Sequence, residues 1–169
     1  MPQIAVINES TAISDADVQK MIPAFDQQWN KDLRPIWGVD AATFNFIPKG
    51  RMPPAGSWWC VFLDNSDQAD ALAYHDLTNE GLPISKVFAK TLMQDKASIS
   101  VGATHELCEM AVDPWLNSAY QDPHGTFWAG EMLWGGRRGW QFRRLHQSME
   151  CRDVPAERFE QVPGGAGPR

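Results

Sequence analysis

THELCEMAVDP, residues 104–114, is the stretch that decides the fold of this chain. Read as an α-helix, it places His105 and Glu109 one turn apart on the same face, with Glu106 projecting beside them. Side chains four residues apart on a helix are close enough to share one ion. The stretch therefore predicts a helix with a polar face that is competent to bind a metal.

The flanking residues favour this helix. Ser98 and Ser100 are candidate N-caps, and Pro114 disfavours helical geometry at the residue before it, so the helix should end near Val112. A catalytic pair in the middle of such a helix is fixed on a rigid element. An apolar face that can pack on a sheet is supplied by Ile99, Val101, Ala103, Leu107, Met110 and Ala111.

The polar face has the spacing of the HExxH motif of zinc hydrolases, with Glu109 in place of the second histidine. A carboxylate oxygen is an acceptable zinc ligand, so His105 and Glu109 supply two of the three protein ligands that a catalytic zinc takes. The third candidate is Glu131, with Asp113 as the alternative and Cys108 as a possible thiolate ligand. An ordinary surface helix with a polar face is the competing interpretation.

Glu106 is the candidate general base, since it can take a proton from water whose pKa a metal ion has lowered. An oxyanion on the substrate needs a further hydrogen-bond donor. Tyr120, His124 and His75 are the polar residues in plausible neighbouring segments, and each is also compatible with an ordinary surface or turn position.

Length and composition indicate a single folded domain. The chain has 169 residues, 43% of them hydrophobic, and eight tryptophans, enough for a continuous core. No apolar run reaches the length of a bilayer span, and no export signal precedes the first strand. We therefore expect a cytoplasmic protein, and association with a virion is compatible with the same features. Cys60, Cys108 and Cys151 are an odd set without repeated spacing, which suits a reducing compartment.

The net charge of the chain changes sign near Glu131. Up to that residue, eight basic residues face seventeen acidic ones, a charge of −9; from Met132 onward there is no lysine, and seven arginines face four acids, a charge of +3. An acidic body repels the phosphate backbone, so no nucleic-acid partner is expected, and an Arg- and Trp-rich contact surface at 137–152 is disfavoured.

Periodicity along the chain predicts a strand, a helix, four further strands and then the His105 helix. The first helix should begin at Ser14 and kink or break at Pro23. The strands are expected at residues 4–8, 43–47, 58–63, 72–76 and 86–90, and the nearly continuous apolar run at 58–63 is typical of a central strand covered on both faces.

Three stretches, residues 67–76, 81–88 and 105–114, resemble a zincin-like family of phage and bacterial proteins that carry an HExxE helix of the SHELLEMLxDP type. A similar helix followed by a Gly-Glu element, matched here by Gly130 and Glu131, occurs in plant exordium-like proteins. The resemblance implies an α+β, zincin-like fold with a mixed, mostly parallel sheet of about five strands on two main helices, the second carrying HExxE.

The same resemblance implies a zincin-like domain over residues 1–131 and an edge strand at 73–76 that aligns a peptide substrate, with Tyr74 and His75 as substrate-binding residues. Residues 132–169 depart from it as an atypical Gly/Arg-rich tail, expected to be largely irregular and mobile beyond Arg143. A shifted reading frame and a natural extension are both compatible with that departure.

The leading prediction is therefore a zinc-dependent hydrolase, a metallopeptidase that uses metal-activated water with Glu106 as general base. Zn²⁺ is the expected cofactor and a peptide or protein the expected substrate, with no membrane partner. The alternative is a catalytically inactive zincin-fold module of phage origin with a binding or structural role.

Overall fold

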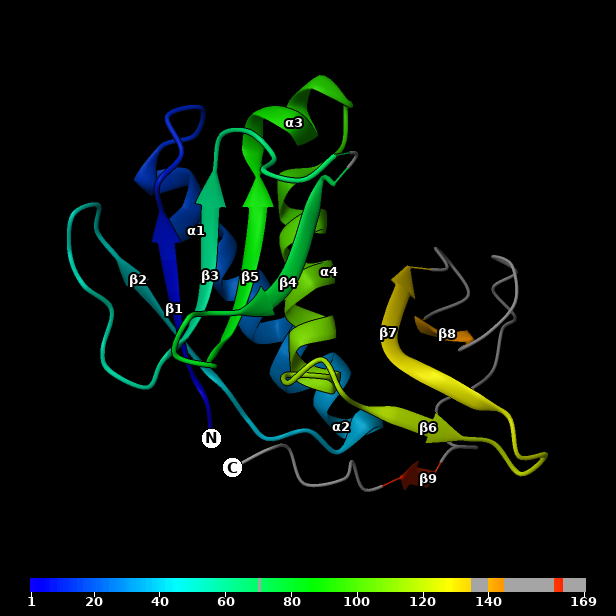
Figure 1. Ribbon diagram of the computed structural model, residues 1–169. Coiled ribbons are helices and arrows are strands. Elements are labelled where there is room, and N and C mark those ends of the chain that lie inside the picture. The colour runs from blue at the N-terminus through cyan, green and yellow to red at the C-terminus, as the bar shows by residue number, and fades with distance from the viewer. Residues whose placement is uncertain (70, 135–139, 145–159, 163–169) are drawn as a thin grey trace.

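In the computed structural model, residues 1–69, 71–134, 140–144 and 160–162 are described, and their backbone forms two sheets with helices (Figure 1). The first sheet has five strands in the order β2-β1-β3-β5-β4, all parallel except β4, which is antiparallel to β5. Its strands are β1 (Gln3–Asn8), β2 (Thr43–Ile47), β3 (Trp58–Leu63), β4 (Ala73–Leu77) and β5 (Pro83–Phe88). The expected α+β class with a mostly parallel five-stranded sheet is thus confirmed.

One face of this sheet is covered by α1 (Asp15–Asp26) and α4 (Ile99–Val112), which lie behind the strands in Figure 1. The main core lies between these two layers, with side chains such as Val6, Phe62 and Val87 facing the helices. The opposite face of the sheet carries a smaller apolar cluster. Its buried members are Ala5, Ile7, Ile47, Val61 and Ile84. The sheet and α4 therefore form two layers packed on a shared core.

The first helix begins as predicted, because Ser14 and Asp17 form a capping box at its N-terminus. The break expected at Pro23 does not occur there, and Pro23 lies inside a continuous α1. The helix instead widens into a π-helical segment, η1 (Gln27–Leu33), before the short α2 (Arg34–Trp37). The buried side chains of Trp29 and Leu33 fix this segment against the core.

The strand expected at residues 86–90 is displaced. It begins earlier, at Pro83, and ends at Phe88, after which α3 (Ala89–Gln94) follows. Ala89–Gln94 is rich in good helix formers, and the backbone N–H of Lys90 donates to the Asp64 carbonyl, which turns the chain away from the sheet.

The helix that carries residues 105–109 forms as predicted. It starts after Ser98 and ends at Val112, with Asp113 at its C-cap. The α4 helix packs against β5 and β4 on one side and against η1 on another, and β7 lies beside it as well. This arrangement places the 105–109 segment beneath the edge of the sheet.

A second, four-stranded antiparallel sheet has the order β8-β7-β6-β9. The boundary expected between residues 131 and 132 falls inside β7, which continues to Trp134. The predictions for 135–139, 145–159 and 163–169 lie outside the described residues. The strands are β6 (Ala119–Gln121), β7 (Phe127–Trp134), β8 (Trp140–Arg144) and β9 (Glu160–Val162).

None of the helices in the described part of the chain is both long and apolar enough to cross a membrane.

Candidate functional site

The candidate site lies where the inner face of β4 meets α4. Side chains alternate along a strand, so His75 points to the face opposite that of Tyr74. Its register partner on β5 is Ser85, which is fully buried and contacts the Met110 sulfur of α4 at 3.5 Å. Because Ser85 and His75 share a face of the antiparallel pair, both side chains lie over α4.

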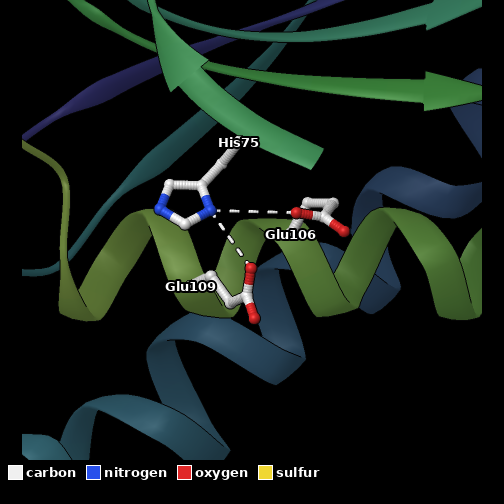
Figure 2. Close-up of side chains that lie close together, drawn as sticks. All are labelled: His75, Glu106 and Glu109. Carbon is white, nitrogen blue, oxygen red and sulfur yellow. Dashed lines mark hydrogen bonds and ion pairs between the residues drawn. The ribbon is translucent and has the colours of Figure 1, made fainter. Parts of the chain in front are cut away.

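Three side chains converge there (Figure 2). His75 Nδ1 lies 3.1 Å from Glu109 Oε2 and 3.8 Å from Glu106 Oε2. One ligand-type atom from each of the three residues lies within 4.8 Å of the other two. The side chains of His75, Glu106 and Glu109 are only 8%, 6% and 12% exposed, so the cluster is shielded from water.

His105 lies on the outer side of this cluster. Its Nε2 is 3.2 Å from Glu109 Oε1, and its side chain is 28% exposed. Glu109 is therefore held between two imidazoles, one on each carboxylate oxygen. The i, i+4 spacing that the sequence indicated is present, and it places His105 nearest to the solvent.

The charges of the cluster shift the pKa of its members in opposite directions. Burial alone lowers the pKa of His75, but its interactions with the carboxylates of Glu106 and Glu109 outweigh burial and raise the pKa to about 9. Burial raises the pKa of Glu106. Burial also acts to raise the pKa of Glu109, but its bonds to His105 and His75 outweigh that and lower it. The cluster thus attracts positive charge, either protons or a metal ion.

Two polar atoms of the cluster lack hydrogen-bond partners. Among the described residues, neither His75 Nε2 nor Glu106 Oε2 has a hydrogen bond, although both are buried. Buried polar atoms are nearly always satisfied, and an unpaired one is a place to look for a bound ion or water. One imidazole and two carboxylates are a donor set that suits zinc, so the residues present fit a divalent cation.

Two of the other candidate ligands lie elsewhere. Asp113 Oδ1 accepts hydrogen bonds from the backbone N–H groups of Asn117 and Ser118, both at 2.9 Å, and so fixes the turn after α4. Cys108 is buried, and burial raises the pKa of its thiol to about 12. A thiol with that pKa remains protonated at neutral pH, in keeping with the small core residue expected from the sequence.

Glu131, the favoured third ligand, lies in β7, and β7 packs against α4. Its side chain is outside what the structure describes, so its role stays a prediction. The same holds for the side chain of Tyr120 in β6. His124 is exposed in the turn between β6 and β7, where its backbone N–H donates to Asp122 Oδ1.

Tyr74, expected to bind substrate, faces away from the cluster. Its hydroxyl donates to Asp67 Oδ1 at 2.8 Å and accepts a hydrogen bond from Lys86 Nζ at 2.6 Å. His75, also expected to contact substrate, instead lies against Glu106 and Glu109. Strand alternation alone left two possibilities for His75: it could face the outside of the sheet or face the helix that carries Glu106 and Glu109. The sequence could therefore have suggested this contact but could not choose between the two faces.

No family model matches the chain, and searches of curated proteins and of solved structures give no match either. The function must therefore be argued from the cluster itself.

Proposed function

We propose that this protein is a metal-dependent hydrolase that acts on peptide bonds, with a zinc ion bound at the cluster of His75, Glu106 and Glu109 and held there by His75 and Glu109. The observation that carries the proposal is the approach of three ligand-type atoms to within 4.8 Å of one another in a buried setting. The buried Glu106 oxygen that has no hydrogen bond supports it, because a water molecule on the bound cation would satisfy that atom.

His75 and Glu109 are the fixed ligands. They come from different elements, β4 and α4, so the packing of the two layers sets the position of one relative to the other. Glu109 is further restrained by His105 on its other oxygen. When bound, a zinc ion supplies Lewis acidity and lowers the pKa of water towards neutrality.

Glu106 is the proton acceptor. Glu109 is engaged on both oxygens, whereas Glu106 Oε2 has no hydrogen bond and lies 3.8 Å from His75 Nδ1. Its carboxylate is therefore available to take a proton from a water molecule at the site and to return it to the leaving group. Burial favours the protonated form of such a carboxyl group, which makes it a stronger base than an exposed one.

The edge of the sheet favours an extended substrate. Within the described part of the chain, β4 pairs only with β5 and is the last strand of the sheet, so its other edge offers backbone groups for pairing. A peptide added along that edge would pass the strand that carries His75. This is the arrangement that the zincin resemblance implies, and it motivates peptide as the substrate class.

The test combines metal content with hydrolysis of a broad peptide panel by the full chain. We expect the wild-type protein to retain zinc and to cleave, and Glu106→Gln to keep the metal and the fold while hydrolysis falls by about 10²- to 10⁴-fold, since an amide cannot accept the proton. Glu80→Gln, an exposed glutamate in the turn before β5, is the matched control and should remain active.

Two outcomes would contradict the proposal. Full activity in Glu106→Gln would remove the proton-transfer role, and absence of metal from the wild type would remove the site. Metal uptake without cleavage of any peptide would instead support the alternative, a catalytically inactive binding module on the same fold.

A further inference from the structure

Glu109 holds its two oxygens towards different imidazoles. Oε2 is 3.1 Å from His75 Nδ1, and Oε1 is 3.2 Å from His105 Nε2. Figure 2 shows one oxygen of Glu109 directed at His75 and the other turned away from it. The two histidines thus lie on opposite sides of one carboxylate, and each presents a ring nitrogen to it.

This placement is poorly suited to a single ion bound by both histidines. The atoms close enough to share one ion come from His75, Glu106 and Glu109, and His105 is not among them. A carboxylate whose two oxygens face the ring nitrogens of two different histidines can instead bridge two cations. Hydrolases with two-metal sites hold their ions about 3.5–4 Å apart.

We infer that the chain binds two divalent cations, bridged by Glu109. The first ion lies among His75, Glu106 and Glu109 Oε2, and the second lies between His105 Nε2 and Glu109 Oε1. The inference rests on the proposed metal site and adds a second, separable site to it.

The two sites differ in strength. The first ion is enclosed by three buried side chains, with His75 and Glu109 as ligands and Glu106 beside it, whereas the second lies at the more exposed His105. His105 is 28% exposed, so water fills the remaining positions of the second ion. The charge of the surrounding chain favours the uptake of cations, since residues 1–131 contain eight basic and seventeen acidic residues.

The test is a titration of the metal-free full chain with Zn²⁺ by calorimetry, with elemental analysis of the saturated protein. We expect two equivalents in the wild type, the second bound at least about tenfold more weakly because it lies nearer to solvent and has no second carboxylate beside it. His105→Ala should retain only the tight equivalent, and His75→Ala should lose the tight one.

His124→Ala is the matched control, since His124 is an exposed turn histidine outside the cluster, and it should still bind two equivalents. His105→Gln is a second variant in case the alanine variant does not fold, and it should bind one. Thermal melts of the metal-free variants check their folding.

Three results would overturn the inference. Saturation of the wild type at one equivalent, unchanged in His105→Ala, would show that His105 only forms an ion pair with Glu109; the one-ion hydrolase would then stand. Saturation of the wild type at one equivalent that is lost in His105→Ala would make His105 a ligand of the same ion as His75. No binding by the wild type would overturn this inference and the proposed function together.

Discussion

Neighbouring residues of β4 belong to two polar clusters that differ in almost every respect. On the outer face, Tyr74 meets Lys86 and Asp67, and all three are joined by hydrogen bonds of 2.6–2.8 Å. On the inner face, His75 meets Glu106 and Glu109 against α4. Strand alternation alone separates the two clusters.

The difference lies in burial and in satisfied contacts. Asp67 and Lys86 are 51% and 26% exposed and form a balanced ion pair. The inner cluster is buried, contains two carboxylates, and leaves an oxygen of Glu106 without a hydrogen bond. A cluster whose charges cancel and whose polar atoms are all hydrogen-bonded has no free ligand atom for a cation. An acidic cluster with an oxygen that lacks a hydrogen bond has one.

The largest expected contrast is in zinc affinity. Glu109→Gln removes a charged ligand from the inner cluster, and we expect affinity to fall more than about 100-fold, since even loss of a ligand's outer partner costs 10–100-fold. Asp67→Asn makes the same chemical change in the outer cluster and should leave affinity unchanged. Calorimetric titration of both variants measures this contrast, and equal affinities would show that the inner cluster is not the zinc site.

The second contrast concerns stabilisation by zinc. A ligand that binds only the folded state at 100 times its dissociation constant stabilises it by about 2.7 kcal/mol. In chemical denaturation with zinc at that concentration, we expect the free energy of unfolding of the wild type and of Tyr74→Phe to rise by this amount. The free energy of unfolding of His75→Ala should rise much less. The residues are adjacent in β4, so a similar gain in all three would place the ion away from the inner face.

The smallest expected effect is in the outer cluster itself. The Asp67–Lys86 pair is partly exposed to water, so Asp67→Asn should reduce the free energy of unfolding by less than about 1 kcal/mol, and less still in high salt. Hydrogen bonds from Lys86 and Tyr74 lower the pKa of Asp67 from its ordinary value. A carboxyl group whose pKa is lower in the folded state stabilises the fold at pH values above its unfolded-state pKa. This stabilisation is lost as the pH falls through its folded-state pKa.

Urea unfolding of wild type and Asp67→Asn at pH 7 and again well below pH 3.8 measures this contribution. The two proteins should differ at pH 7 and converge in acid. A difference that persists in acid would mean that Asp67 acts through packing rather than through its charge.

Local pattern in the sequence determined the helix that carries the site. Ser98 and Pro114 bracket α4 within a residue or two, and the i, i+4 spacing placed His105 beside Glu109. The same kind of pattern identified β1, β2, β3 and β4. It misplaced both ends of β5, which was expected at residues 86–90 and spans Pro83–Phe88, because tertiary contacts turn Ala89 and Lys90 into α3.

Only the tertiary structure decided which residue completes the cluster. His75 and Glu109 are separated by 34 residues, and their contact depends on the β4–β5 register and on the packing of α4 beneath that edge. A shift of one residue in the register would place Tyr74 on the inner face and turn His75 to the outer face. Spacing along a helix is fixed by the geometry of one local element, whereas a contact between two elements depends on their long-range packing, which the pattern of either element leaves undetermined.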